Sequence, residues 1–254
     1  MLLAIDIGNT NIKFGIFENE TLKDTLTVST DRHKTADEYS VQLYALSQTY
    51  GFSQSDFVDC IISSVVPSVT ARIASAIRRV IGIEPKIVGP GTRTGLDIRI
   101  EDPGALGADL CVLCVAAKAL YLAPCIVISM GTATVMCVLD RSGAMLGGPI
   151  APGVNISLDA LASSAALLHA VSLDAPTSVI GKSTDHSIRA GVVWGNVCMI
   201  DGMIDRIEHE LGERCSVVAT GGLAHDIIPH CTHAIDIRDD LIMQGLRLIY
   251  EKNR

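Results

Sequence analysis

The sequence has no run of lysine or arginine, and its longest apolar stretch is interrupted. A net charge of -8 over 254 residues argues against a nucleic-acid surface. Lys118 and Pro124 divide the apolar stretch 110–128 into a buried helix and a following strand, rather than one membrane span. The amino-terminal segment lacks basic residues and its apolar run stops at Asp6, unlike a signal peptide. We therefore expect a soluble cytoplasmic protein without nucleic-acid or membrane partners.

The chain also lacks a second cysteine pair that could complete a zinc site with Cys111 and Cys114. Because this pair lies within an apolar helix pattern, core packing is favoured over metal or redox chemistry. Four further cysteines lie in strand-like apolar runs and are expected to pack as small hydrophobic residues: Cys60, Cys125, Cys137 and Cys215. The histidines are scattered, and His225, His230 and His233 gather only in a loop-like region, where solvated side chains are expected.

Residues 2–17 (LLAIDIGNTNIKFGIF) form an apolar strand, a polar turn and a second apolar strand. The first strand ends in Asp6, and an ionised group there needs a compensating cation or hydrogen bonds. Magnesium carrying phosphate oxygens would provide such compensation. Gly8 permits close backbone approach, and Asn9, Thr10 and Asn11 add short donors, which suits a phosphate. An ordinary hairpin with a polar turn remains the alternative for this segment alone.

A second hairpin of this kind occupies residues 125–139 (CIVISMGTATVMCVL). Aligning Gly8 with Gly131 places Asn9 opposite Thr132, and Asp6 opposite Ser129, so only one copy keeps its acid. With 48% hydrophobic residues, the chain is long enough for two modest cores. The repeat predicts a duplicated domain in which each half offers a phosphate loop to the cleft between them.

The predicted elements begin alike in both halves, with three strands followed by a helix. In the first half, strands at 2–7, 12–17 and 21–30 precede a helix at 35–50, a strand at 57–63, a helix ending near 81 and a strand at 83–88. In the second half, strands at 125–130, 134–139 and 144–150 precede helices at 155–168 and 187–211, a strand at 216–219 and a helix at 240–250. This order resembles the ribonuclease H-like unit of the actin and sugar-kinase superfamily. The resemblance implies an α/β protein with mixed sheets flanked by helices, divided into domains 1–120 and 121–254.

Asp109 stands in the first turn of an apolar helix predicted at 105–122. One explanation of this acid is structural, because the helix dipole stabilises a carboxylate in the first turn. The other is functional, because the small neighbours Gly107 and Ala108 leave room for a ligand beside it. As a general base, Asp109 would accept the proton of a hydroxyl that attacks a terminal phosphate in line.

Two loops in the second half also contain residues suited to a ligand. Ser183 and Thr184 follow Gly181 and can donate to a ligand, although capping of the next helix is an equally good role. The pair Gly221-Gly222 suits close approach to a base or ribose, but a turn needs the same residues. Three glycines along the helix 187–211 would allow close helix packing across a dimer: Gly191, Gly195 and Gly202.

Taken together, several motifs in this order resemble the type III pantothenate kinase family, bacterial enzymes that phosphorylate pantothenate at the start of coenzyme A synthesis. The likeness extends over essentially the whole chain. The motifs are DIGNTN at 6–11, GPGTRTGL at 89–96, GAD at 107–109, GTAT at 131–134, GGPIAPG at 147–153 and GKST at 181–184.

The resemblance implies transfer of phosphate from ATP to pantothenate, giving 4'-phosphopantothenate, by a homodimer that uses magnesium and potassium or ammonium. It implies Asp109 as catalytic base. It places the nucleotide phosphates on Asp6, Gly8, Asn9, Thr10, Asn11, Lys13 and Thr132. It places pantothenate near Gly107, Ala108, Asp109, Leu110 and Thr184, magnesium at Asp6, and the monovalent cation at Ser129.

Three positions depart from the family pattern. Leu110 stands where the family usually has arginine, which removes a charge-assisted bond to the substrate carboxylate worth about 1.5 to 3 kcal/mol. Ser129 replaces the usual aspartate and weakens the cation site, and Ile100 replaces an aromatic residue. These departures keep open an alternative, a catalytically weakened paralogue that binds nucleotide or regulates another protein. An actin-like chaperone or filament protein is disfavoured by the short length and by GAD after a helix-start turn.

Overall fold

The computed structural model describes residues 1–164 and 172–254, and the chain forms two compact units. One unit consists of Met1–Gly95, Asp102–Ala116 and Asp240–Arg254, and the other of Leu96–Glu101 and Ala117–Asp239. The sequence suggests a single boundary after residue 120, whereas the chain passes between the units several times. One reason is that α7 (Leu241–Lys252), late in the sequence, packs on strands of the first unit.

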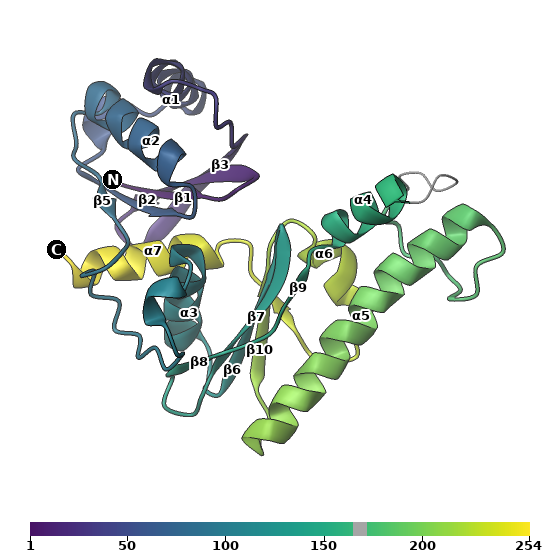
Figure 1. The fold of residues 1–254 in the computed structure, drawn as a ribbon. Coiled ribbons are helices and arrows are strands. Elements are labelled where there is room, and N and C mark those ends of the chain that lie inside the picture. Colours follow the sequence, from purple (N-terminus) through teal and green to yellow (C-terminus); the bar gives the residue numbers. More distant parts are fainter. Residues whose placement is uncertain (165–171) are drawn as a thin grey trace. The chain divides into compact units, whose positions relative to one another are not determined.

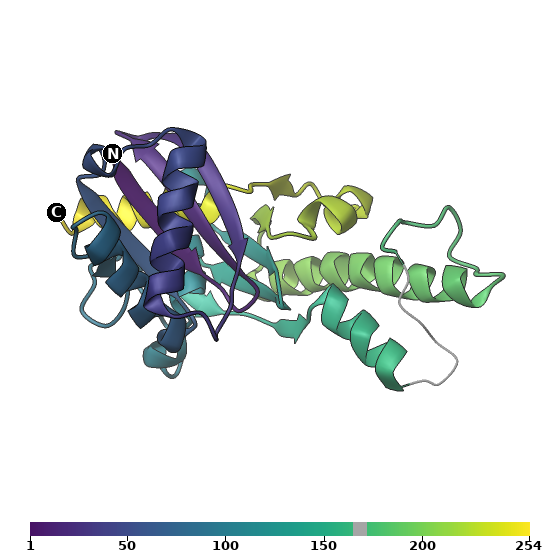
Figure 2. The ribbon, with the colours of Figure 1, turned by 90° about the horizontal axis from the view of Figure 1, so that it is seen from above.

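The first unit is built on a mixed sheet with the strand order β3-β2-β1-β4-β5. Its strands are β1 (Leu2–Ile7), β2 (Asn11–Glu18), β3 (Thr21–Ser29), β4 (Asp59–Ser64) and β5 (Lys86–Ile87). The first three pair antiparallel, and β4 and β5 run parallel to β1. Helices α1 (Ala36–Tyr50) and α2 (Pro67–Val80) lie on one side of these strands and α7 on the other (Figure 1; Figure 2 shows α1 and α2 from above).

Strict alternation along β1 sets which side chains face which layer. Leu3, Ile5 and Ile7 belong to the buried cluster formed with α1 and α2. Asp6, being out of phase with them, projects from the opposite face of the sheet. Helix α1 begins where predicted, because Thr35 and Glu38 form a capping box.

The second unit repeats this arrangement with the order β11-β10-β6-β7-β8, and β9 also pairs with β7. Its strands are β6 (Cys125–Met130), β7 (Ala133–Leu139), β8 (Met145–Gly147), β9 (Ile150–Pro152), β10 (Ser216–Thr220) and β11 (Asp236–Ile237). β7 runs antiparallel to β6, whereas β10 and β11 run parallel to it, as in the first sheet. The duplicated mixed-sheet fold predicted from the sequence is therefore confirmed.

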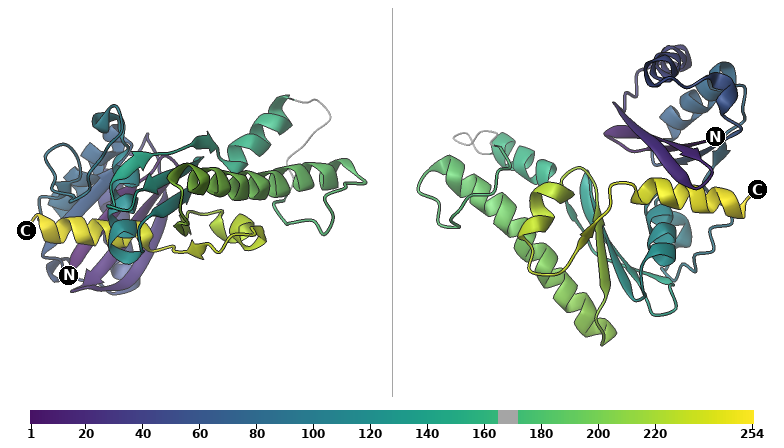
Figure 3. Two further views of the ribbon diagram at one scale, coloured as in Figure 1. Left: turned by 90° about the horizontal axis from the view of Figure 1, so that it is seen from below. Right: turned by 180° about the vertical axis from the view of Figure 1, so that it is seen from behind.

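Helices α4 (Val154–Ser164), α5 (Thr184–Leu211) and α6 (Ala224–Ile227) belong to this second unit. Figure 3 shows α5 as one continuous helix, and its apolar side chains share a core with strands β6, β7 and β10. The short 3-10 helices are η1 (Gln54–Asp56), η2 (Pro103–Ala105) and η3 (Ile228–His230). Among the described helices, none combines the length and the apolar character needed to cross a bilayer.

Three expectations need correction. The strand predicted at 144–150 is two short strands, because Gly148 has φ 153° and a Cβ there would lie 1.8 Å from the Met136 carbonyl oxygen. The helix predicted from 187 starts at Thr184, since the Ser183 hydroxyl caps it by accepting from the His186 amide at 3.3 Å. His233 is not a solvated loop residue, because its side chain is only 16% exposed. The end of the predicted helix 155–168, from 165 on, lies outside the described residues.

Cys111 and Cys114 are buried in α3 (Ala108–Leu120), as expected for core residues. Cys60, Cys125 and Cys137 are buried as well, while Cys215 is half-buried. Burial raises the pKa of the Cys125 thiol to about 12, so this thiol stays protonated and unreactive at neutral pH.

The glycine pair after β10 offers a matched test of the second unit. Gly221 has φ 114°, and a Cβ there would lie 2.2 Å from the Met130 carbonyl oxygen, whereas a Cβ on Gly222 has open space. We expect Gly221→Ala to lower the free energy of unfolding by about 2 to 4 kcal/mol, through backbone strain and collision. We expect Gly222→Ala to change it by less than about 0.5 kcal/mol. Urea unfolding of both variants measures the difference, and equal stabilities would contradict this account of the turn.

Candidate active site

The turn between β1 and β2 is closed by the backbone and held by the residue after β3. The Gly8 amide donates to the Asn11 carbonyl oxygen at 2.9 Å. Thr30 donates its hydroxyl to the Gly8 carbonyl oxygen at 2.7 Å and its amide to the Thr10 carbonyl oxygen at 2.8 Å. Because the backbone is fixed in this way, the exposed side chains of Asn9, Thr10 and Asn11 lie along one short loop.

Arg32 brings a positive charge to this turn. Its guanidinium donates to the Asn9 side-chain oxygen at 2.7 Å. Lys13 stands opposite Asp6 in the antiparallel register of β1 and β2, so a second cation lies at the base of the turn. Two cations and a row of short polar side chains make the turn suitable for an anionic ligand.

Asp6 lies at the centre of the first unit's polar cluster. The parallel pairing of β1 with β4 sets Asp6 beside Ser63, which is fully buried. Burial and the nearby Asp109 carboxylate raise the pKa of Asp6 to about 7, while the Ser63 hydroxyl and Lys13 act in the opposite direction. Neither Oδ1 of Asp6 nor the Ser63 hydroxyl has a partner at hydrogen-bonding geometry among the residues that the structure describes.

Asp109 reaches this cluster from the first turn of α3. Its Oδ1 accepts a hydrogen bond from the Leu110 amide at 2.8 Å. Burial raises the pKa of the carboxyl, against the lowering effect of the Leu110 and Asp109 amides. A Cβ at Gly107, two residues before the acid, would lie 2.5 Å from this same Oδ1, so a side chain at that position would displace the carboxylate. The Leu110 amide therefore orients the Asp109 carboxylate, and Gly107 leaves room for it.

These groups fit a hard divalent cation. Asp6 and Asp109 provide two carboxylates close enough for one to raise the pKa of the other, and Oδ1 of Asp6 is buried without compensation. Magnesium binds such oxygen ligands through one or two carboxylates, keeping waters and substrate phosphates as its other ligands. A cation here would remove the cost of burying Asp6 in its ionised form.

The second turn is shaped by contacts within its own unit. The Gly131 amide donates to the Ala133 carbonyl oxygen at 3.0 Å, and the Gly153 amide to the Thr132 carbonyl oxygen at 3.1 Å. A Cβ on Gly153 would lie 2.4 Å from that Thr132 oxygen, so the GGPIAPG segment packs tightly on the turn. Thr134 is buried, and its hydroxyl has no hydrogen-bond partner within the described ranges.

Ser129 occupies the position in the second sheet that Asp6 occupies in the first. It pairs with Thr220 across the parallel strands β6 and β10, as Asp6 pairs with Ser63. The second unit therefore has two hydroxyls where the first has a carboxylate and a hydroxyl. Neutral hydroxyls hold a cation more weakly than charged oxygens do.

Thr184 is the first residue of α5, and it is exposed. It lines a groove of about 890 Å³ together with Ser157 of α4 and Ser187 and Asn196 of α5. Ser183 therefore caps the helix, and Thr184 lines the groove, where its hydroxyl can donate to a ligand.

The structure thus brings Asp6, Lys13 and Asp109 together in the first unit, while Ser129, Thr132 and Thr184 belong to the second. Ala108 and Leu110 flank Asp109 in the first turn of α3. Sequence reasoning missed three contributors: Thr30, Arg32 and Ser63. Thr30 and Ser63 are the polar last residues of the predicted strands 21–30 and 57–63, and this position was a signal for them. Only the pairing of the strands shows what these two residues contact.

The two mixed sheets, each with its hairpin turn, have the fold of actin and the sugar kinases. A Baf-family protein from Campylobacter jejuni has a similar fold, with a TM-score of 0.65 and 18% identity over 99% of this chain and 98% of that chain. The inorganic polyphosphate/ATP-glucomannokinase of Arthrobacter sp. strain KM is similar over 100% and 99% of the two chains, with a TM-score of 0.51 and 13% identity.

Sequence comparison identifies the family. The family described as Type III pantothenate kinase matches residues 2–206. Two type III pantothenate kinases, from Roseiflexus sp. (strain RS-1) and Moorella thermoacetica, are 44% and 43% identical over 254 residues, covering 100% of this chain and of each relative. The chain belongs to the type III pantothenate kinase family.

The pKa of Asp6 predicts a pH dependence of stability in the protein without metal or nucleotide. Its folded-state pKa of about 7 exceeds the ordinary aspartate value of 3.8, so the folded state binds the extra proton between these values, and stability falls as pH rises through them. We expect wild type to lose up to about 4 kcal/mol more than Asp6→Asn between pH 4 and pH 8, because the two pKa values differ by about three units and each unit is worth about 1.4 kcal/mol. Urea unfolding at both pH values measures this, and parallel pH profiles for the two proteins would contradict it.

Proposed function

We propose that the protein transfers the terminal phosphate of ATP to pantothenate, giving 4'-phosphopantothenate, the first step of coenzyme A biosynthesis. The observation that carries this proposal is the cluster of Asp6 and Asp109, two acids from separate elements with raised pKa values in one unit. Full-length relatives named type III pantothenate kinase support the choice of acceptor.

The first turn receives the nucleotide phosphates. The side chains of Asn9, Thr10 and Asn11 donate to phosphate oxygens, Gly8 lets the backbone approach them closely, and Lys13 and Arg32 supply positive charge. Asp6 holds magnesium, which when bound neutralises phosphate charge. Thr132 in the second unit is a further phosphate ligand in this proposal.

Asp109 acts as the general base. Its carboxylate accepts the proton of the acceptor hydroxyl as the hydroxyl oxygen attacks the terminal phosphorus and ADP leaves. The raised pKa makes the carboxylate a better proton acceptor than an ordinary aspartate. The Leu110 amide fixes the direction of the carboxylate by donating to Oδ1, and the missing side chain of Gly107 leaves space for that oxygen.

Pantothenate binds beside Gly107, Ala108 and Leu110, with Thr184 as a hydroxyl ligand. Leu110 offers this acceptor an apolar contact in place of a charge-assisted bond. Ser129, beside Thr220, holds the monovalent cation through neutral oxygens, so the dependence of activity on potassium or ammonium should be weak.

A homodimer is part of the proposal. Gly191, Gly195 and Gly202 lie on one face of α5, and a Cβ at any of them would have no neighbour within 4 Å in the described chain. A second copy fits such an open face, and light scattering measures the mass against the 26.9 kDa of one chain. The cytoplasmic location expected from the sequence stays a prediction, tested by cell fractionation.

A weakened paralogue that binds nucleotide or regulates a partner is the second candidate, favoured by Leu110 and Ser129. Calorimetric titration with ATP and with pantothenate distinguishes the two. The enzyme binds both compounds, whereas the paralogue binds nucleotide alone.

Replacing the base tests the assigned chemistry. We expect Asp109→Asn to lower kcat by about 100-fold or more, because the amide cannot accept the hydroxyl proton, while ATP affinity changes little. A coupled assay of ADP release with and without pantothenate and potassium measures turnover, and calorimetry measures ATP binding. Full activity of this variant would show that another group is the base.

Position 110 tests the acceptor site. We expect Leu110→Arg to lower KM for pantothenate by about tenfold or more, because a charge-assisted bond to the carboxylate is worth about 1.5 to 3 kcal/mol. Leu110→Lys is the control, because lysine supplies the positive charge without the planar guanidinium of arginine, and it should lower KM for pantothenate by less. If neither variant changes KM, the carboxylate of pantothenate does not lie beside this residue.

A further inference from the structure

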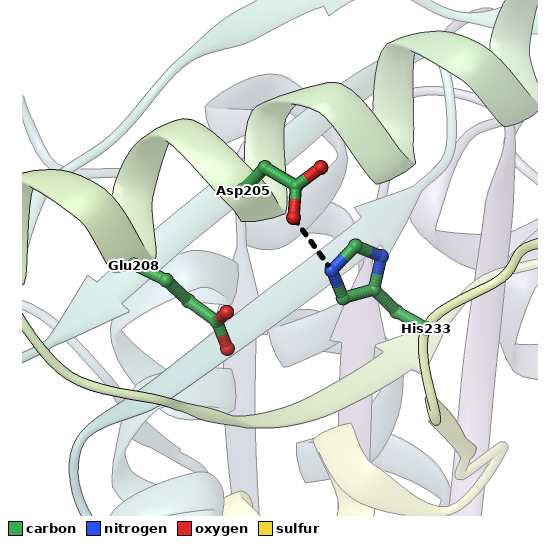
Figure 4. Close-up of side chains that lie close together, drawn as sticks. All are labelled: Asp205, Glu208 and His233. Carbon is green, nitrogen blue, oxygen red and sulfur yellow. Dashed lines mark hydrogen bonds and ion pairs between the residues drawn. The ribbon is translucent and has the colours of Figure 1, made fainter.

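A cluster of ionisable side chains lies on α5, among residues that the proposed reaction does not use. Asp201, Asp205 and Glu208 share one face of the helix, at spacings of four and three residues. His233 belongs to the segment between η3 and β11. Figure 4 shows the side chains of Asp205, Glu208 and His233 close together, with His233 and Asp205 joined by a hydrogen bond. One ligand atom from each of these three residues lies within 4.8 Å of the others.

Asp201 fixes the orientation of the imidazole. Its Oδ1 lies 2.9 Å from Nδ1 of His233, and its carboxylate also accepts the backbone amides of Thr232 and His233 at 2.9 and 3.2 Å. With Nδ1 occupied, Nε2 is directed at Asp205, 3.1 Å away. Histidines that bind metals are oriented in this way, with the second ring nitrogen held by a carboxylate.

Burial distinguishes this group from an ordinary acidic surface. The side chain of Glu208 is 8% exposed and that of His233 is 16% exposed. Glu208 accepts from the Cys215 amide at 2.9 Å and from Arg214 at 2.6 Å. Because Arg214 is 82% exposed, its guanidinium can move into solvent when a cation takes its place beside Glu208.

The spacing is close to that of a coordination shell. Ligand atoms about 2.0 to 2.2 Å from a tetrahedral ion are separated by roughly 3.3 to 3.6 Å. The 3.1 Å between His233 Nε2 and Asp205 Oδ1 already approaches this value. Glu208 needs a shift of roughly 1 to 2 Å, which rotation about its side-chain bonds provides.

We propose that Asp205, Glu208 and His233 bind one divalent cation of the zinc type, with water completing the shell. One imidazole nitrogen and two carboxylate oxygens form a ligand set suited to zinc, and Asp201 acts through His233 as a positioning residue. The cation joins α5 to the segment that leads into β11, and so stabilises the second unit. All three ligands belong to the second unit, whereas Asp6, to which magnesium is assigned, belongs to the first.

Zinc binding to the full chain tests the proposal by two measurements. Equilibrium dialysis with metal analysis counts zinc per chain, and thermal unfolding with and without zinc measures stabilisation. All proteins carry Cys198→Ser, because this exposed thiol could bind zinc itself. The parent is expected to bind one zinc per chain and to unfold at a higher temperature with zinc present.

Two substitutions remove ligands, and a third is the matched control. Asp205→Asn and His233→Ala are expected to weaken zinc binding at least about tenfold and to abolish the thermal shift. Asp205 is 66% exposed, so Asp205→Asn keeps the fold and decides the question if His233→Ala does not fold. His225→Ala removes a histidine that also pairs with an aspartate, Asp239, but has no third ligand among the residues that the structure describes, and this variant should bind zinc as the parent does.

Three results overturn the proposal. The first is a parent that binds no zinc, and the second is Asp205→Asn binding zinc as tightly as the parent. The third concerns the class of metal, since magnesium prefers oxygen ligands and should bind this site more weakly than zinc. Equal affinity for magnesium would contradict a zinc-type site.

Discussion

The parallel pairing of β1 with β4 places a carboxylate where water cannot reach one of its oxygens. This pairing sets Asp6 beside the buried Ser63, on the sheet face opposite the core formed with α1 and α2. An ionised group in that position is costly without a cation or a donor. The neighbouring Asp109 carboxylate increases the cost, since two negative charges then share one region. The first unit therefore gains most from a ligand that brings positive charge, which is the property a nucleotide-metal complex has.

Duplication has given the two units the same framework and different chemistry. The strands on either side of each turn have matching positions, with Asp6 beside Ser63 in one sheet and Ser129 beside Thr220 in the other. A single change from carboxylate to hydroxyl makes the second position neutral. Of these two matched positions only the one in the first unit carries a carboxylate, whereas the second unit provides backbone shape at its turn through tightly packed glycines such as Gly148 and Gly153.

Local patterns in the sequence predicted most of the fold, because they act over a few residues. Alternation and a glycine turn identified both hairpins, and the helical spacing of apolar residues identified α1. Residues that meet through parallel strand pairing were not predictable in this way. Ser63 lies 57 positions after Asp6, and only the register of β4 on β1 brings the two together.

The same limit applies to side chains whose partners come from another element. His233 was expected to be solvated, because its neighbours in sequence are polar loop residues, and its contacts with Asp201 and Asp205 on α5 become visible only after folding. The strand predicted at 144–150 failed for a different reason. Its composition suits a strand, but Gly148 must approach the Met136 carbonyl oxygen, which divides the segment in two.

The position of α7 has a consequence for the order in which the chain folds. This helix packs against β1, β2 and β4, and Met243 contacts Gly15 on β2. All five strands of that sheet come from residues before 90, whereas α7 begins at Leu241. During synthesis the face of β1 that carries Asp6 therefore waits for a segment translated some 230 residues later. The second unit leaves the ribosome before that segment does, so it can be complete while the earlier unit still exposes one apolar side to chaperones and proteases.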